Sequence, residues 1–181
     1  MRDRDEIIDI IADVYEEYSI SRVGFDCLEL CKKMGITVKK YSESKEACDL
    51  LIRLDEDGIS GINNRTNEIF IYYNDNIDPR KRLCFTISHE IGHICLGHHL
   101  EWQYETDEMK KEADIFANEL YCPQAFMIWY GFTTRKELMT YFGITESYAE
   151  VLLDKLRKRE SQNLTNSEIR LINIFEKNRK K

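Results

Sequence analysis

The chain has 181 residues, of which 43% are apolar, and it contains only two prolines. This length predicts one domain, or one domain with a short extension, and the composition excludes low-complexity and repeat proteins. The formal net charge is −7, but the residues from Lys155 to Lys181 carry nine basic and three acidic groups, so the preceding part carries −13. Because a body this acidic repels phosphates, direct nucleic-acid binding is an unexpected function.

The sequence shows no sign of export or membrane insertion. The opening segment, Met1–Glu6, is charged, and no apolar run approaches the ~18 residues of a membrane span. Six cysteines are scattered without a C-x-x-C pair, which favours free thiols in a reducing compartment. We therefore expect a cytoplasmic protein with no membrane partner.

The first half of the chain predicts two helices followed by a small sheet. Apolar spacing indicates helices at Asp5–Tyr18 and Asp26–Met34, the second of which ends at Gly35. Short apolar or alternating segments then predict three to four mostly antiparallel strands, the last two forming a hairpin. The segments are Ile36–Tyr41, Asp49–Leu54, Ile59–Asn63 and Glu68–Tyr73.

The second half predicts helices only, which makes the fold class α+β. One helix runs from about Arg80 to Gly97, and a second begins at Thr106 or Asp107 and continues to Leu120. Three further helices follow, from Thr133 or Thr134 to Phe142, from Thr145 or Ser147 to Glu160, and from Asn166 or Ser167 to Asn178. We expect a catalytic domain at residues 1–132 and a helical C-terminal extension at 133–181 packed on it.

The most informative motif is H-E-x-x-H, formed by His89, Glu90 and His93 on the first of these long helices. Residues four apart share one helix face, so the two imidazoles converge on one metal ion. Glu90 is rotated by about 100° from His89 and lies beside the metal, where it can act as a general base. Apolar residues flank the motif, so the helix is expected to be buried. The pattern is typical of a zinc hydrolase with an open coordination position.

A third metal ligand is expected on the following helix. Glu112 lies 19 residues after His93, and its neighbours at i+3 and i+4 are apolar, so its carboxylate faces inward. A buried carboxylate is costly unless it is paired or bound to a metal. Glu119, two turns further along that face, is the main alternative. Asp114 points elsewhere and is expected to anchor a ligand histidine.

The two long helices resemble those of the ImmA/IrrE family of metallopeptidases. The resemblance rests on the run Phe85–His93, which matches an H-E-[LI]-G-H helix, and on Glu112–Pro123, which is close to E-A-N-x-F-A-x-x-L-L-M-P. Three positions depart from that pattern, namely Asp114, Tyr121 and Cys122, and none of them is a proposed ligand. The segment Leu138–Thr145 also resembles a later family element.

The resemblance implies a zincin-like fold and a site-specific endopeptidase that cleaves a protein substrate. Relatives serve phages, conjugative elements and stress responses, and they often cleave a helix-turn-helix repressor, so a repressor is the implied partner. The family's third ligand maps onto Glu112.

The predicted mechanism uses four residues and one zinc ion per chain. His89, His93 and Glu112 hold the metal, and Glu90 takes the proton of the attacking water and passes it to the leaving amine. His98 and His99 follow Gly97 and are expected in a loop near the substrate. The donor to the oxyanion stays open between three candidates, Tyr104, Tyr121 and His98.

Two other function classes stay open. Glu137–Leu156 has the outline of a helix-turn-helix, which would suit a DNA-binding regulator, but the second helix begins with carboxylates at Glu146 and Glu150. A partner-binding regulator with a structural zinc site is the other alternative. Structural sites are closed by four protein ligands and are rich in cysteine, whereas here the cysteines are scattered.

Overall fold

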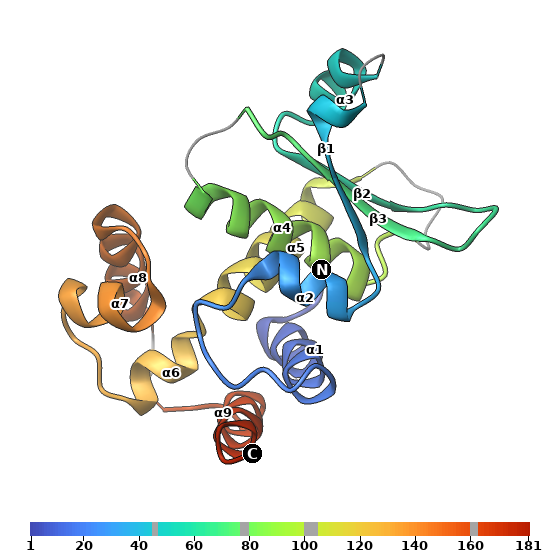
Figure 1. The fold of residues 1–181 in the computed structure, drawn as a ribbon. Helices are drawn as coiled ribbons and strands as arrows, with labels where there is room; N and C mark the ends of the chain where they lie inside the picture. Colours follow the sequence, from blue (N-terminus) through green and yellow to red (C-terminus); the bar gives the residue numbers. More distant parts are fainter. Residues whose placement is uncertain (45–46, 77–79, 100–104, 160–162) are drawn as a thin grey trace. The chain divides into compact units, whose positions relative to one another are not determined.

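The computed structural model describes residues 1–44, 47–76, 80–99, 105–159 and 163–181. Their contacts divide them into two compact units, whose helices and strands are labelled in Figure 1. The first unit contains Met1 and residues 26–117, and the second contains residues 2–25 and 118–181. The predicted boundary between residues 132 and 133 stays a prediction. None of the described helices is both long and apolar enough to cross a membrane.

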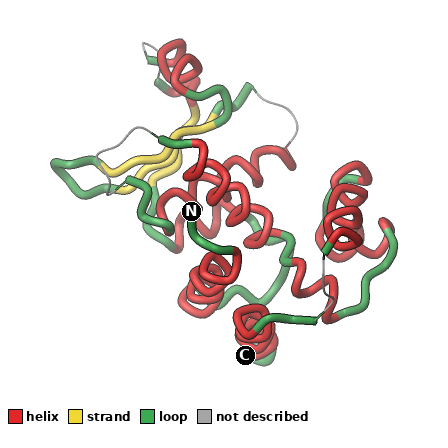
Figure 2. Tube along the Cα trace, turned by 180° about the vertical axis from the view of Figure 1, so that it is seen from behind, coloured by secondary structure: helices red, strands yellow, loops and turns green. Residues whose placement is uncertain are grey.

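The first unit contains a three-stranded mixed sheet in the order β1-β3-β2, whose strands lie side by side in Figure 2. The strands are β1 (Thr37–Lys40), β2 (Gly58–Ile62) and β3 (Ile69–Tyr73). β2 and β3 form the predicted antiparallel hairpin, whereas β1 pairs with β3 in parallel. The expectation of a mostly antiparallel sheet is therefore corrected to one pairing of each kind.

The prediction of a further strand at Asp49–Leu54 is wrong, because this segment belongs to helix α3 (Cys48–Leu54). The backbone N–H of Leu51 donates to the Ala47 carbonyl, and that of Asp55 donates to the Leu51 carbonyl. Leu50 and Leu54 are 58% and 67% exposed, so no partner sheet buries them. A short apolar run is ambiguous between helix and strand, and here helical hydrogen bonds within the segment satisfy its backbone.

The remaining elements of the first unit confirm the predicted helices within a few residues. Helix α4 lies against β2, β3 and α2, and therefore covers the sheet. Helix α5 begins in this unit and crosses the division between Ala117 and Asn118. The elements are α2 (Cys27–Lys33), the short 3-10 turn η1 (Tyr41–Glu43), α4 (Arg80–Cys95) and α5 (Asp107–Tyr121).

The second unit is helical and is built around the packing of the first helix of the chain on the last. Its buried aromatic centre contains Tyr15, Phe126 and Phe175, whose rings meet in pairs. Capping boxes begin three of the helices, at Asp3, Thr134 and Thr165. The helices are α1 (Arg4–Glu17), α6 (Gln124–Trp129), α7 (Arg135–Phe142), α8 (Glu146–Lys158) and α9 (Asn166–Arg179).

The sequence analysis does not predict helix α6, because it treats Pro123 only as a signal that ends the preceding helix. In the structure Pro123 is also the N-cap of α6, and the Phe126 N–H donates to its carbonyl. Proline suits the first turn of a helix, where its missing N–H costs nothing.

Candidate metal centre and active site

The motif helix α4 is held close to α5 by a glycine inside the motif. Ile87 and Ile91 of α4 are fully buried. A Cβ atom on Gly92 would lie 3.1 Å from Cδ1 of Phe116 and 3.3 Å from Cα of Ala113, both on α5. A Cβ atom here would force its neighbours to move by a few tenths of an ångström, so Gly92 lets α4 and α5 approach each other closely.

The two motif histidines turn the same ring nitrogen toward one point. Nε2 of His89 and Nε2 of His93 are 3.0 Å apart. On the other side of each ring, Nδ1 of His89 lies 2.9 Å from Oδ1 of Asp114, and Nδ1 of His93 lies 3.0 Å from Nδ1 of His98. Tetrahedral coordination at zinc–nitrogen distances of 2.0–2.1 Å would separate the two nitrogens by about 3.3 Å, so this pair fits a zinc ion.

The contact between Asp114 and a motif histidine that the sequence predicted is present. Burial opposes the protonation of His89, but the hydrogen bond to Asp114 and the charges of nearby carboxylates raise its pKa. A carboxylate on Nδ1 fixes the ring orientation and leaves Nε2 for a metal.

Among the described residues, Glu105 also brings a carboxylate to the two histidines, on the side where their Nε2 atoms face each other. Its Oε1 lies 3.0 Å from Nε2 of His93. Candidate ligand atoms of His89, His93 and Glu105 all lie within 4.8 Å of one another. The His93 contact and the Lys110 ammonium, 3.0 Å from Oε2, outweigh burial and lower the pKa of Glu105 to about 2. The carboxylate is therefore ionised, as a metal ligand must be.

Glu112, the ligand predicted from the sequence, is buried but turned toward another partner. Its Oε2 lies 3.2 Å from Nε2 of His98, whose Nδ1 contacts His93. Helix geometry explains the difference. Asp114 and Lys110 are four residues apart and share the face of α5 that meets His89 and Glu105. Glu112 lies between them in the sequence and therefore points from another face of the helix. Glu112 thus reaches the histidine pair through His98.

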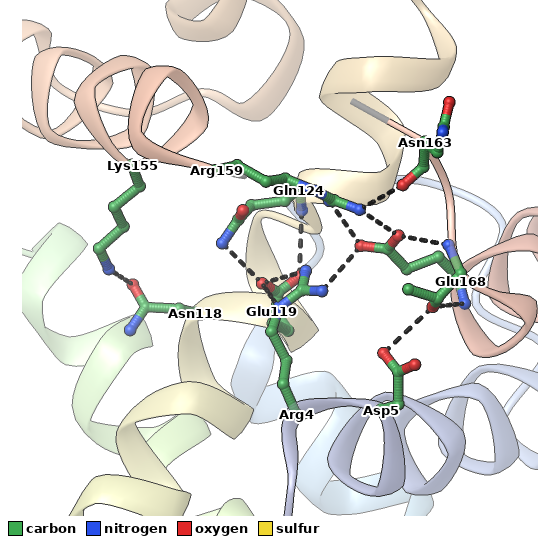
Figure 3. Close-up of polar contacts among 10 residues, drawn as sticks. Arg4, Asp5, Asn118, Glu119, Gln124, Lys155, Arg159, Asn163 and Glu168 are labelled. Carbon is green, nitrogen blue, oxygen red and sulfur yellow. Dashed lines mark hydrogen bonds and ion pairs between the residues drawn. The ribbon is translucent and has the colours of Figure 1, made fainter. Parts of the chain in front are cut away.

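Glu119, the other carboxylate considered from the sequence, is held by a cation (Figure 3). Its Oε1 accepts from Nε and Nη2 of Arg4, at 3.1 and 2.8 Å, and from the Gln124 side chain at 2.9 Å. Arg4 also donates to Glu168, which Arg159 contacts at 2.8 and 2.7 Å. These partners account for the burial of Glu119 without a metal.

The predicted general base, Glu90, lies beside the histidine pair and is 7% exposed. Its Oε2 accepts a hydrogen bond of 2.5 Å from the hydroxyl of Ser60 on β2. Burial raises the pKa of Glu90, and the Ser60 hydrogen bond and the two histidines act against that rise. A carboxylate with a raised pKa is a better acceptor of a proton at neutral pH.

A cavity of about 290 Å³ opens in front of these groups. Its polar lining includes Glu90, His93, His98, His99 and Glu105, and its apolar lining includes Leu54, Ile59 and Met109. A concave site with apolar walls and a few converging polar groups is the usual form of a ligand site. The sequence reading had no signal for Ser60 or Glu105, which come from a strand and a connecting segment outside both helices.

The three candidates for the oxyanion donor lie in different environments. His98 lines the cavity but is engaged between His93 and Glu112. Tyr121 is absent from the described lining of this cavity, and its ring packs against Phe25 at 5.7 Å. Tyr104 lies outside the described residues. The identity of this donor stays a prediction.

Comparison with protein-family models gives one finding, a match of residues 31–153 to the model described as the IrrE N-terminal-like domain of a peptidase family. The matched range contains the sheet, both long helices and α7. No curated protein and no solved structure gives a significant match to the chain.

Proposed function

Because the chain belongs to the IrrE N-terminal-like family of metallopeptidases, as its resemblance to ImmA/IrrE proteins predicted, we propose that it is a zinc-dependent endopeptidase. The observation that carries this proposal is the convergence of two Nε2 atoms, 3.0 Å apart, beside a buried carboxylate and a cavity. The proposal assigns this helix pair a zincin-like arrangement, in which metal donors and a base lie in one place.

The chemistry is divided between the metal and the chain. A bound zinc ion supplies Lewis acidity toward water and toward the scissile carbonyl. Oε1 of Glu90 takes the proton of the attacking water, because Oε2 is already held by Ser60, and then delivers it to the leaving amine. The substrate is a peptide bound along the cavity with its scissile carbonyl between Glu90 and the histidine pair.

For the third ligand we propose Glu105, and the alternative is Glu112, which the sequence and the family resemblance favour. Glu105 is supported by its contact with His93 and by Lys110, which orients its second oxygen. Glu112 would then act on His93 through His98. Both readings use His89 and His93, so the proposed metal content is one zinc ion per chain.

The proposed substrate is a helix-turn-helix repressor of a phage or mobile element, cleaved in the cytoplasm. This part of the proposal is supported only by the family, whose relatives were described above as acting on such repressors. The site itself supports a protein substrate through its cavity and its peptidase chemistry.

The first test is the zinc content of four purified proteins: wild type, His89→Ala, Glu105→Gln and Glu112→Gln. We expect about one zinc per chain in wild type and none in His89→Ala, since two ligands do not hold zinc against a chelator. Loss in Glu105→Gln with retention in Glu112→Gln would establish Glu105 as the ligand, and the reverse would establish Glu112. A wild-type chain that takes up no zinc would overturn the metal site.

The second test is Glu90→Gln, which removes the base and keeps the size of the side chain. We expect the variant to bind zinc as wild type does and to lose at least about 100-fold in cleavage rate, the usual contribution of a general base. Full cleavage by this variant would contradict the proposed mechanism.

The regulator alternative has one structural observation in its favour, the α7–Gly143–α8 pair, in which Gly143 adopts φ of 67°. Against it, Glu146 and Glu150 of α8 form ion pairs with Arg135, and they place carboxylates at the start of the would-be recognition helix. A DNA titration at low and high salt tests it, since phosphate binding weakens steeply with salt. Absence of binding at low salt would remove this alternative.

A further inference from the structure

Three polar side chains from three separate segments meet at the wall of the cavity. Ser60 comes from strand β2, Glu90 from helix α4, and His99 from the turn that follows α4. The Ser60 hydroxyl lies 2.5 Å from Oε2 of Glu90 and 2.9 Å from Nε2 of His99. Ser60 is therefore the bridge between the other two.

The direction of both hydrogen bonds follows from the number of protons available. An ionised carboxylate only accepts, so the single hydroxyl proton of Ser60 is donated to Glu90. The Ser60 oxygen can then interact favourably with His99 only as an acceptor, which requires a proton on Nε2 of His99. The order of donation is His99 to Ser60 to Glu90.

The close approach of β2 to α4 is built into the sequence. A Cβ atom on Gly58 would lie 2.8 Å from Cγ2 of Thr86 and 3.4 Å from Cγ of Glu90, so a larger residue would push the strand away. The Asp55 carboxylate accepts from the backbone N–H groups of Asp57 and Gly58 and holds the start of the strand. Ser60 itself is 8% exposed, so water competes little for its hydroxyl.

We infer that Ser60 is a positioning residue for the base Glu90, and that His99 fixes the direction of the Ser60 hydroxyl. This inference rests on the proposed peptidase function. The pair holds Oε2 of the carboxylate, so that Oε1 faces the attacking water in one orientation. A base held in one orientation is effective because small displacements of a reacting group cost large factors in rate.

The hydrogen-bond order is tested first in the full zinc-loaded chain, by ¹⁵N NMR of the four imidazoles at about pH 8, where neutral histidine dominates. An imidazole with an ordinary pKa is neutral at this pH, so His99 carries a single ring proton. We expect its proton on Nε2 in wild type and a shift of this tautomer balance in Ser60→Ala. A wild-type proton on Nδ1 would overturn the inference, because Ser60 would then donate to His99.

The positioning role is tested next with a peptide identified from a proteome-derived mixture by the new amino termini that the wild-type chain produces. We expect Ser60→Ala to lower kcat by about 10- to 100-fold with KM and zinc content unchanged, and Ser60→Thr, which keeps the hydroxyl, to restore most of the loss. An unchanged kcat in Ser60→Ala would contradict the positioning role.

A matched control is Ser42→Ala, because Ser42 also donates to a carboxylate, that of Asp75 at 2.7 Å, and neither residue is among those that line the cavity. We expect wild-type kcat in this variant, and an equal loss in both serine variants would overturn the inference. No cleavage by wild type would overturn the proposed function and the positioning role of Ser60 with it. The His99 tautomer would still decide separately whether the hydrogen-bond order exists.

Discussion

The two units of the molecule each bury a cluster of charged side chains, and the two clusters are satisfied in different ways. In the second unit, Glu119 and Glu168 are held by the guanidinium groups of Arg4 and Arg159, so every buried carboxylate meets a cation. In the first unit, His89 and His93 direct ring nitrogens at each other across 3.0 Å. Oε1 of Glu105 lies 3.0 Å from Nε2 of His93, so three donor atoms of kinds that bind metals converge there.

This difference shows that burial of charge does not by itself identify a functional site. The guanidinium–carboxylate cluster is complete, and its residues line none of the cavity that opens on the histidines. The histidine cluster combines converging donor atoms with a cavity and with the predicted base. Convergence of such donors beside a cavity therefore separates a candidate site from a structural cluster, and the following predictions test that separation.

The largest expected effect is on the complete cluster. Arg4→Ala leaves Glu119 without its cation, and we expect the free energy of unfolding to fall by about 3 kcal/mol, the lower end for breaking a buried pair, because Arg4 is 30% exposed. Urea unfolding measures this loss. Arg170→Ala is the control, since its partners Asp9 and Asp13 are about half exposed or more, and it should cost less than about 1 kcal/mol. Equal losses of unfolding free energy in the two variants would show that the buried ion pairs of Arg4 stabilise the fold no more than the exposed pairs of Arg170.

In the cluster around His89 and His93 we expect an effect on metal binding and only a minor effect on the free energy of unfolding. Asp114→Ala removes the partner of Nδ1 of His89 and should weaken zinc affinity by about 10- to 100-fold, as loss of such partners does. Competition with a chromophoric chelator measures this. Asp114 is 53% exposed, so the unfolding free energy of the metal-free chain should stay close to wild type. A large loss of metal-free stability would make Asp114 a folding residue instead.

A smaller effect is expected where α4 meets α5. Gly92→Ala gains helix propensity of about 1 kcal/mol, but its methyl group overpacks against Phe116, which costs about 1–3 kcal/mol. We expect a net loss of roughly 1 kcal/mol in urea unfolding together with weaker zinc binding. Combining it with Phe116→Leu should recover part of the Gly92→Ala loss, because the contact is shared. If the stability losses of the two single variants simply added in the double variant, the contact with Phe116 would not be the cause of the Gly92→Ala loss.

The smallest expected effect is a change in the acid dependence of stability. Burial raises the pKa of Glu168, but hydrogen bonds from Arg159, Thr165 and Arg4 outweigh it, so the pKa lies below the ordinary 4.5. A lowered folded pKa means that the ionised carboxylate stabilises the fold above about pH 4.5 and that this contribution is lost as pH falls through the folded pKa. The stability difference between wild type and Glu168→Gln should therefore shrink below pH 4.5, as measured by unfolding at several pH values. A constant difference would contradict the pairing.

The sequence predicted the parts of this protein that depend on residues close in the chain. The H-E-x-x-H spacing predicted that His89 and His93 face one point, because residues four apart share a helix face, and the structure places their Nε2 atoms 3.0 Å apart. Asp114 was predicted as the anchor of a histidine by the same reasoning, and the structure confirms the contact. The hairpin of β2 and β3 was also predicted, since its two strands are adjacent in sequence.

The sequence did not predict features that depend on distant residues. Glu112 and Glu119 carry the same signal, an acid on an apolar helix face. Their partners distinguish them, and one of these, Arg4, lies 115 residues from Glu119 in the sequence. Glu105 and Ser60 reach the site from a connection and a strand, where no periodicity marks a ligand. The parallel pairing of β1 with β3 was likewise not predicted, because the sequence of a strand does not indicate which other strand it pairs with.

The order in which the ribosome makes this chain has a consequence for the second unit. Helix α1 is made before α9, but its buried residues Ile7, Ile8 and Ile11 belong to a unit in which α1 packs on α9. Asp9 and Ser167, which bond across that contact, are 158 residues apart. At about 5–20 residues per second, α1 waits roughly 8–30 s for its partner. During that time its apolar face is exposed, so new chains should depend on chaperones that shield such surfaces.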